Sequence, residues 1–394
     1  MSGGTRPRSD INASLNRREL LSSAGRGALV AGLAIPALAH ASYALAAGGG
    51  AGGKKVGFAV VGLGQLGLGQ IMPAFKDCKL AKPVALVSGH PDKARKAAEQ
   101  FGVDPKHIYN YDSYDSMKDN PEIDVVYVVL PNSMHPEYTI RAAQAGKHVL
   151  CEKPMANSAA DCRKMIDACR AAGKKLQIGY RLRYEPNTIA LIDAVARKQA
   201  GELKMLECGA GFNIGDPNQW RLKKDMAGGG CLMDIGIYAL NASRYISGEE
   251  PVEVNAMTFA NRSDPRFKEV EEHCNFQLRF RSGVLSNCAS SYSCGLNRFR
   301  AYCAGGGWAE VDPGLSYRGV NFRIQRPRQR QPEDPDLPDI NQFAAEMDAM
   351  AECVLNDKPS RTPGEEGLKD LRVIEAIYGS ARTGKAVKIE QATA

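Results

Sequence analysis

The chain has 394 residues, of which 44% are hydrophobic, 24% charged and 7% aromatic. This composition is that of a globular protein and excludes disordered, collagen-like and small disulfide-stabilised chains. Because a single hydrophobic core rarely exceeds about 250–300 residues, the length predicts two domains. The formal net charge of +7 is small and forms no basic stripe along the sequence, which argues against a nucleic-acid partner.

The first 46 residues predict an export signal. Arg17 and Arg18 precede an apolar, alanine-rich run at residues 28–47, which ends in small residues suited to cleavage. Paired arginines before such a run favour the twin-arginine route, which exports folded proteins. We therefore expect residues 1–46 to be removed and the mature protein to be periplasmic, with no membrane segment. A Sec signal with a chance arginine pair, or an uncleaved anchor, is the alternative.

Residues 47–53 contain only glycine and alanine and are predicted to be a flexible linker. The first folded domain is predicted over residues 54–179. Its strands are expected at residues 56–63, 83–88, 123–130, 148–151 and 175–179, and its helices at 66–75, 92–101 and 158–172, with another ending near residue 145. Strands that alternate with helices predict a doubly wound parallel sheet, the Rossmann arrangement, and thus an α/β fold.

The pattern changes in the second predicted domain, residues 180–394. A helix is expected at residues 187–198, followed by strands at 204–211, 252–260, 273–281, 284–291 and 297–304. Consecutive strands favour an α+β domain with a large, mostly antiparallel open sheet. Residues 326–338 are rich in proline, glutamine and charge and are expected to form an extended surface loop, and helices at 341–356 and 364–383 close the chain.

A glycine-rich turn follows the first predicted strand and precedes the first predicted helix. In the dinucleotide-binding fingerprint, one glycine makes the tight turn, the next lets the pyrophosphate approach the backbone, and the third lets the helix pack against the strand. The helix N-terminus adds amide donors and partial positive charge. The predicted pyrophosphate-binding residues are Gly62, Leu63, Gly64, Gln65, Leu66 and Gly67.

The end of the second predicted strand indicates which dinucleotide binds. NAD enzymes usually place an acidic residue there to bind the ribose 2′-hydroxyl. This chain has Ser88-Gly89-His90, with Lys93 just beyond. Because a hydroxyl and a cation can hold a 2′-phosphate, NADP is favoured over NAD.

Two further segments carry candidate catalytic residues. Glu152-Lys153-Pro154 ends a strand, and ligands bind at that edge of a doubly wound sheet. In the glycine-rich segment 228–238, Asp234 and Tyr238 are four residues apart and share one helical face if the turn is continuous. A tyrosine, a lysine and a carboxylate can together move a proton while a hydride leaves carbon. A structural Asp234 that caps the helix is the alternative.

The eleven cysteines form no Cys-x-x-Cys pair, and no histidine cluster joins them at metal-ligand spacing. An odd number also cannot all pair. We therefore expect buried thiols that pack as small apolar side chains, with no metal site and no required disulfide.

Several segments together resemble the glucose–fructose oxidoreductase family. They are GLGQLG (62–67), LPNSMH (130–135), AGKHVLCEKPMA (145–156), GYRLRY (179–184), QWR (219–221), GGGCLMDIGIYALN (228–241) and PGEEG (363–367). The EKP segment marks the wider superfamily, which includes inositol dehydrogenases, whereas the combination is specific to this periplasmic branch. The similarity extends from about residue 54 to residue 388.

The resemblance implies a sugar oxidoreductase whose NADP(H) stays bound between half-reactions. An aldose such as glucose is oxidised at C1 to the lactone, and the same cofactor then reduces a second sugar to the polyol in a ping-pong cycle. In this chain, Lys153 would polarise the sugar hydroxyl, Tyr238 would accept and donate the proton, and Asp234 would orient the sugar. The cofactor contacts implied are Ser88 and Lys93 at the 2′-phosphate, Leu130, Asn132, His135 and Glu152 at the ribose and nicotinamide, and Arg181, Trp220, Arg221 and Tyr317 from the second domain.

The chain departs from that family in two places. The stretch before the first strand lacks the long proline-rich arm that covers the adenine and wraps a neighbouring subunit. The segment before Gln219 is also shorter, which predicts a more open sugar pocket and a second aldose as the possible acceptor. We expect a homodimer formed through the exposed face of the second sheet, with a homotetramer as the alternative.

Two other functions are alternatives to this one. One is an ordinary sugar dehydrogenase, periplasmic or cytoplasmic, with exchangeable NADP. The other is a non-catalytic sugar- or cofactor-binding protein, and the presence of both Lys153 and Tyr238 argues against it. His135 is a rival proton acceptor, although a cofactor contact is the favoured interpretation.

Overall fold

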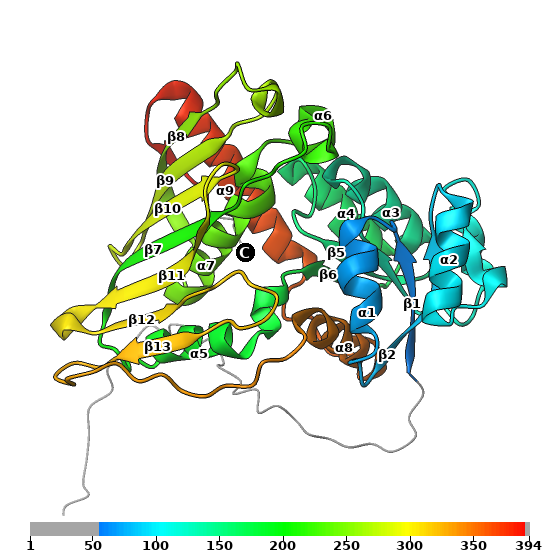
Figure 1. Cartoon of the computed structure of the whole chain (residues 1–394), viewed down its shortest axis with the longest axis horizontal. Helices are drawn as coiled ribbons and strands as arrows, with labels where there is room; N and C mark the ends of the chain where they lie inside the picture. The colour runs from blue at the N-terminus through cyan, green and yellow to red at the C-terminus, as the bar shows by residue number, and fades with distance from the viewer. Residues whose placement is uncertain (1–54, 391–394) are drawn as a thin grey trace, which may run out of the picture. The chain divides into compact units, whose positions relative to one another are not determined.

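The computed structural model describes residues 55–390 (Figure 1). The predicted signal at residues 1–46 and the predicted linker at 47–53 lie outside the described residues. Over the described range, no helix combines the length and the apolar character needed to cross a membrane.

The first sheet has six strands in the order β3-β2-β1-β4-β5-β6, and all of its pairings are parallel. The strands are β1 (Val56–Val61), β2 (Ala81–Val87), β3 (Ile108–Tyr109), β4 (Val125–Val128), β5 (His148–Glu152) and β6 (Leu176–Gly179). Every side chain of β1 and β4 is buried, as expected for strands covered on both faces. The predicted doubly wound parallel sheet is therefore confirmed. Strand β3 was not predicted, because two residues give no periodic signal.

Helices cover both faces of this sheet. On one face pack α1 (Met72–Ala74), α2 (Pro91–Phe101) and α8 (Gln342–Leu355), and on the other α3 (His135–Gln144) and α4 (Ala159–Ala171). Helix α8 comes from the C-terminal segment, yet its Phe343 and Met347 share a core with Phe58 of β1. The carboxylate of Asp348 also accepts backbone hydrogen bonds from residues 79–81. The region beyond residue 179 therefore contributes a helix to the first domain.

The second sheet has eight strands in the order β13-β12-β11-β7-β10-β9-β8-β14. The strands are β7 (Leu203–Gly211), β8 (Pro251–Phe259), β9 (His273–Phe280), β10 (Leu285–Ser291), β11 (Leu296–Cys303), β12 (Trp308–Val311), β13 (Phe322–Gln325) and β14 (Val387–Lys388). All pairings are antiparallel except that of β7 with β10, which confirms the predicted mostly antiparallel sheet. Strands β12, β13 and β14 were not predicted.

One face of the second sheet is covered by α5 (Pro186–Ala196), α7 (Ile237–Ser247) and α9 (Gly364–Thr383) (Figure 1). Side chains of β9 alternate between buried and exposed, as in a sheet with one open face. Met205, Met257, Phe259 and Leu285 are exposed large hydrophobic residues of these strands.

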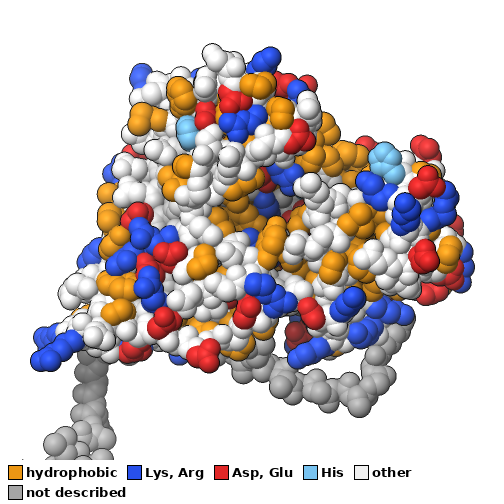
Figure 2. Space-filling view, in the orientation of Figure 1, with side chains coloured by type: hydrophobic (Ala, Val, Ile, Leu, Met, Phe, Trp, Pro, Cys, Tyr) orange, Lys and Arg blue, Asp and Glu red, His pale blue; other side chains and the backbone are white. Residues whose placement is uncertain are grey.

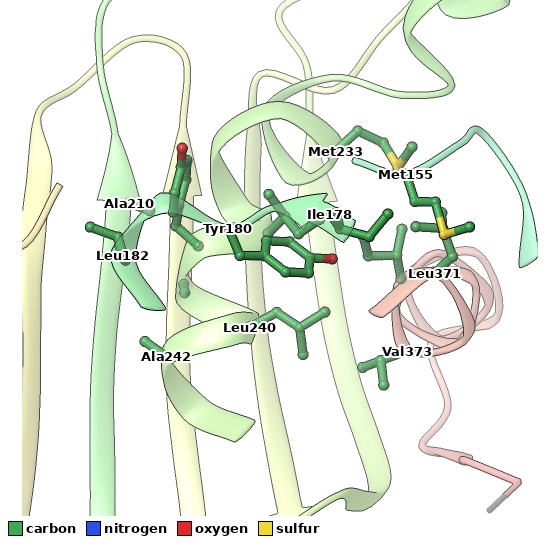
Figure 3. Close-up of a cluster of buried hydrophobic side chains, with 14 of the residues drawn as sticks. Met155, Ile178, Tyr180, Leu182, Ala210, Met233, Leu240, Ala242, Leu371 and Val373 are labelled. Atoms are coloured by element: carbon green, nitrogen blue, oxygen red, sulfur yellow. The ribbon is translucent and has the colours of Figure 1, made fainter. Parts of the chain in front are cut away.

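A methionine-rich junction joins the two domains. Figure 3 shows Met155, from the loop after β5, and Met233 next to Leu371 of α9. A Cβ at Gly367 would lie 2.7 Å from the Met155 sulfur, so α9 approaches this loop as closely as a glycine permits. The loop that carries Lys153 is therefore packed against the second domain.

A buried ion network joins α7 to α9. The guanidinium of Arg244 contacts the carboxylates of Asp370 at 2.6 Å, Glu250 at 2.7 Å and Glu366 at 2.9 Å. Burial raises the pKa of Asp370 to about 6 even though Arg244 acts in the opposite direction. Lys369 also pairs with Glu366 at 2.8 Å and with Glu250 at 3.2 Å, so Asp370 is the acid of this network that relies on Arg244 alone.

Replacing Arg244 with methionine should lower the free energy of unfolding by about 3–5 kcal/mol at neutral pH, because it leaves the buried Asp370 without its cation and Glu250 and Glu366 with Lys369 alone. The loss should shrink as the pH falls. In the variant, burial and mutual repulsion of the carboxylates raise their folded-state pKa above the unfolded values. Protonation at lower pH therefore stabilises the folded chain. Chemical unfolding at pH 7 and pH 5 measures both effects. Arg170→Met removes only exposed pairs and should cost less than about 1 kcal/mol; equal losses in the two variants would contradict the network's role.

Candidate active site

The three glycines of the fingerprint after β1 differ in what a side chain at each position would contact. Gly62 has a positive φ of 98°, and a Cβ there would lie 2.1 Å from the carbonyl oxygen of Val129. A Cβ at Gly67 would lie 2.4 Å from the carbonyl oxygen of Gly62. Gly64 is exposed, and a Cβ there would meet nothing within 4 Å. The fold itself therefore requires Gly62 and Gly67, whereas Gly64 leaves open space of the kind that a dinucleotide pyrophosphate fills.

The helix after this turn differs from the predicted regular α-helix over residues 66–75. It contains a π-helical segment, η1 (Gly67–Ile71), before α1. Such segments widen a helix by one residue per turn and are frequent at functional sites.

At the end of β2, Ser88 is buried and Lys93 is exposed on α2. The Ser88 hydroxyl oxygen accepts a hydrogen bond from the backbone N–H of His90 at 3.1 Å, which shapes the turn into α2. Asp92, the acidic residue of this segment, is paired with Arg95. The structure thus places the Ser88 hydroxyl at the end of the strand, with a cation on the helix that follows.

Lys153 and Asp234 form a buried ion pair between the two domains. The Nζ of Lys153 donates to the backbone oxygen of Asp234 at 2.6 Å and to its carboxylate at 3.2 Å. The other carboxylate oxygen accepts from the Tyr292 hydroxyl at 3.0 Å and pairs with Arg221 at 3.2 Å. Burial acts to raise the pKa of Asp234, but Lys153 and Arg221 outweigh it and lower the pKa to about 2. Asp234 is therefore an anion throughout the working pH range.

The same ion pair affects the lysine. Burial acts to lower the pKa of Lys153, but the Asp234 carboxylate and the neighbouring Tyr238 outweigh it, so the net shift is upward. Lys153 is therefore a permanent cation, able to donate hydrogen bonds but not to accept a proton at neutral pH.

Tyr238 lies beside the Lys153–Asp234 ion pair, but the residue that binds its hydroxyl is not part of that pair. Lys153 Nζ is 4.9 Å from the centre of the Tyr238 ring, whereas Arg181 Nε donates to the hydroxyl at 3.2 Å. The condition for Asp234 and Tyr238 to share one α-helical face, a continuous turn, is not met, because residues Leu232–Gly236 form a π-helical segment, η7, before α7 begins. The side chains of Asp234 and Tyr238 nevertheless both contact Lys153.

Gly229 and Gly230, which precede η7, are required by packing. A Cβ at Gly229 would lie 1.9 Å from the Tyr378 hydroxyl, and one at Gly230 would lie 2.2 Å from the backbone oxygen of Glu271. The Glu271 carboxylate accepts the N–H groups of Gly230 at 2.8 Å and Leu232 at 3.0 Å. This carboxylate fixes the start of the segment that carries Asp234.

The residues predicted at the ribose and nicotinamide lie at the carboxyl ends of β4 and β5. His135 is fully buried, and its ring nitrogens lie 2.9 Å from the Pro154 oxygen and 2.8 Å from the Leu130 oxygen. Because the ring is fully buried and has a backbone oxygen against each nitrogen, a substrate hydroxyl cannot reach it. Asn132 donates to the backbone oxygen of Ala227 at 2.9 Å, which links the first domain to α6 (Lys224–Ala227).

Glu152 is buried and accepts a hydrogen bond from the Tyr127 hydroxyl at 2.7 Å. Burial raises the pKa of Glu152. Trp220 packs against Arg221, which pairs with Asp234. The centre of the Tyr317 ring lies 4.7 Å from the guanidinium carbon of Arg181, which donates to Tyr238. Figure 2 shows the surface hollowed between the two domains, with hydrophobic side chains along the hollow.

Three residues that hold this site were not singled out from the sequence: Tyr292, Glu271 and Gln342. Each reaches the site from a strand end or helix far away in the chain, and none belongs to a local motif. Within the described residues, the eleven cysteines are unpaired, and no group of three or more His, Cys, Asp or Glu side chains is placed to hold a metal ion.

The fold and this site define a dinucleotide-dependent oxidoreductase. Residues 56–180 match the domain described as "Oxidoreductase family, NAD-binding Rossmann fold", and residues 189–309 match the GFO/IDH/MocA C-terminal domain. The chain therefore belongs to the GFO/IDH/MocA family, and the family assignment from the sequence motifs is confirmed. It is an NAD(P)-dependent oxidoreductase that acts on CH–OH groups of sugars.

Several known proteins are similar to this chain. The crystal structure of aldose–aldose oxidoreductase from Caulobacter crescentus, complexed with glycerol, is 50% identical, has a TM-score of 0.83, and covers 85% of this chain and 100% of that one. The D-xylose 1-dehydrogenase (NADP(+)) of Haloarcula marismortui is 30% identical over 81% of this chain and 89% of its own length. A 3-ketoreductase from Actinomadura kijaniata, solved with NADP, has a TM-score of 0.73 at 24% identity, covers 83% of this chain and 98% of that one, and shares the fold.

The glycine geometry predicts separable effects of two substitutions. Gly67→Ala should lower the melting temperature, because the new methyl group would overlap the Gly62 carbonyl. Gly64→Ala should leave the melting temperature nearly unchanged and weaken dinucleotide binding at least tenfold, because the methyl group occupies the space where the pyrophosphate approaches the backbone. Thermal unfolding and NADP titration measure the two effects, and tight binding by the Gly64→Ala protein would contradict this placement.

Proposed function

We propose that the protein oxidises an aldose such as glucose at C1 to the lactone and passes the hydride to a second sugar, a ketose or an aldose, through NADP(H) that stays bound. The observation that carries the proposal is the 50% identity to an aldose–aldose oxidoreductase across 85% of this chain. The arrangement of Lys153, Asp234 and Tyr238 at the ligand-binding edge of the first sheet supports it.

The three residues have distinct chemical roles in this proposal. Lys153, a buried cation, donates a hydrogen bond to the substrate hydroxyl and polarises its O–H bond. Asp234, a buried anion, accepts from a neighbouring sugar hydroxyl and fixes the sugar's orientation. Tyr238 takes the hydroxyl proton during oxidation and returns a proton during reduction. The nicotinamide, when bound, supplies the hydride acceptor at the reacting carbon.

The preference for NADP is supported by Ser88 and Lys93. The hydroxyl lies at the strand end that the adenosine ribose approaches, and the exposed lysine can turn toward a phosphate there. The xylose dehydrogenase relative is named as NADP-dependent.

A second candidate is a dehydrogenase with exchangeable NADP. The 30% identity to D-xylose 1-dehydrogenase over 81% of the chain favours it, because that relative is named for the oxidation of one sugar with NADP(+) and for no second sugar. The two candidates differ in one measurable property, namely whether the cofactor leaves between half-reactions.

The test uses purified mature protein without added cofactor. Glucose should produce a reduced-nicotinamide absorbance band, and a second sugar should remove it; a panel of ketoses and aldoses then identifies the acceptor. Lys153→Ala and Tyr238→Phe should retain bound cofactor but lose at least a hundredfold in the rate at which the band forms. A band that appears only with excess NADP would favour the exchangeable dehydrogenase, and wild-type rates in both variants would exclude the proposed site.

We further propose that the protein is a homodimer that pairs through the uncovered face of the second sheet. A concavity of about 880 Å³ lies on this face, lined by polar and apolar side chains that include Asn255, Met257, Gln277 and Asn287. Met257 is 75% exposed and Phe259 is 61% exposed, and large exposed hydrophobic groups on one face typically mark an interface.

Met257→Asp should therefore convert the dimer to a monomer, because the carboxylate would be buried without a partner. Light scattering after size exclusion measures the mass. Leu355→Asp, at a 48% exposed position at the end of α8, is the matched control and should leave the mass unchanged. A wild-type protein that is monomeric at micromolar concentration would contradict the proposal.

A further inference from the structure

Two cations flank Tyr238, and only one of them contacts its hydroxyl in the described structure. Arg181 Nε donates to the hydroxyl oxygen at 3.2 Å, and the two side chains are 4% and 8% exposed. Lys153 lies over the ring face and directs its Nζ to Asp234. The contact to the oxygen that would carry the proton thus comes from Arg181.

The guanidinium of Arg181 is fixed in this position by its other nitrogens. Nη1 donates to the side-chain oxygen of Gln342, and Nη2 donates to the backbone oxygen of Leu315 at 2.7 Å. Gln342 is in turn held by its Nε2, which donates to the backbone oxygen of Ser316 at 2.9 Å. Helix α8 therefore holds Arg181 against the tyrosine, and Arg181 cannot turn away without breaking three hydrogen bonds.

Several charged or titratable groups lie around Tyr238. Lys153 after β5, Arg181 in η5 (Arg181–Tyr184) and Tyr317 in the loop after β12 face it. Arg183 and Tyr245 line the same small cavity as Tyr238, and the Glu152 carboxylate interacts with Lys153 and Tyr317. Asp234, in the preceding turn, is paired with Lys153 and Arg221. Of the two cations beside the tyrosine, only Arg181 donates to its hydroxyl.

We propose that Arg181 is a positioning residue for proton transfer, whose Nε–H fixes the Tyr238 oxygen and stabilises the deprotonated tyrosine that accepts the substrate proton. This proposal rests on the proposed function, in which Tyr238 is the proton acceptor. During oxidation the substrate O–H bond breaks and its proton passes to Tyr238 Oη, while the carbon gives up its hydride to NADP. During reduction the proton and the hydride pass to the second sugar.

An arginine suits this role better than a lysine would. Its guanidinium stays charged at every working pH, and its planar set of donors can hold the phenol, Gln342 and the Leu315 carbonyl at once. A single ammonium could not keep all three partners in one plane. The conservative variant Arg181→Lys should therefore restore only part of the effect.

The test measures how fast glucose produces the reduced-nicotinamide band in a single turnover, with saturating NADP, between about pH 6 and pH 10. Arg181→Gln should lower the rate at pH 7 about ten- to hundredfold, and the rate should recover as the pH rises and the tyrosine ionises unaided. Arg181→Lys should lie between this variant and the wild type. Gln342→Leu, which removes the brace and keeps the arginine, should shift the profile in the same direction.

Gln177→Leu is the matched control. Gln177 is buried like Gln342 and also bonds to α8, donating to the Glu346 backbone oxygen at 3.1 Å, but has no bond to Arg181 or Tyr238. Its variant should keep the wild-type pH profile even if its melting temperature falls. If Arg181→Gln does not fold, Gln342→Leu and Arg181→Lys carry the test.

The outcomes separate this proposal from the proposed function. A rate that falls equally at every pH in the Arg181 and Gln342 variants, or an unchanged profile in both, would overturn the role of Arg181 and leave Tyr238 as the acceptor. A change confined to the NADP concentration needed for half-saturation would assign Arg181 to cofactor binding alone and also overturn it. A Tyr238→Phe protein with wild-type rate would instead overturn the proposed function.

Discussion

The ion pair between Lys153 and Asp234 is the contact on which the site depends. Each side chain comes from a different domain, and they are only 12% and 13% exposed, so neither charge is adequately solvated by water alone. A buried charge without its partner is costly, and the remaining oxygen of Asp234 is satisfied by Tyr292 and Arg221. The same interaction therefore holds the two domains together at the cleft and sets the charge states of the groups that would contact a sugar.

This pair can form because the backbone around it comes unusually close to neighbouring atoms. The glycine run at residues 228–230 lets Glu271 and Tyr378 reach the backbone before η7, and the methionine junction packs the loop after β5 against α9. Side chains larger than hydrogen at these glycines would displace Asp234 from Lys153. The glycines of this segment are therefore required by packing, independently of any role in binding.

Helix α8 shows where local sequence patterns cease to be informative. The sequence predicted this helix almost to the residue, at 341–356 against Gln342–Leu355. It did not indicate that the helix crosses back to the first sheet or that Gln342 would hold Arg181, because helix periodicity identifies a buried face and not the surface that buries it. The same limit applies to Tyr292, which is one aromatic residue at a strand end until the fold brings it to Asp234.

The sequence by itself determined the parallel and antiparallel sheets, the glycine turn for a dinucleotide and the identity of the Lys, Asp and Tyr at the cleft, because each of these is encoded in local periodicity or a short motif. Only the tertiary structure decided which group each of them touches. In the folded chain, Lys153 donates to Asp234 and Arg181 donates to the Tyr238 hydroxyl, and a backbone oxygen lies against each ring nitrogen of His135. The physical reason is that a side chain's hydrogen-bond partners depend on distances between segments far apart in the chain, and those distances exist only once the two sheets have packed.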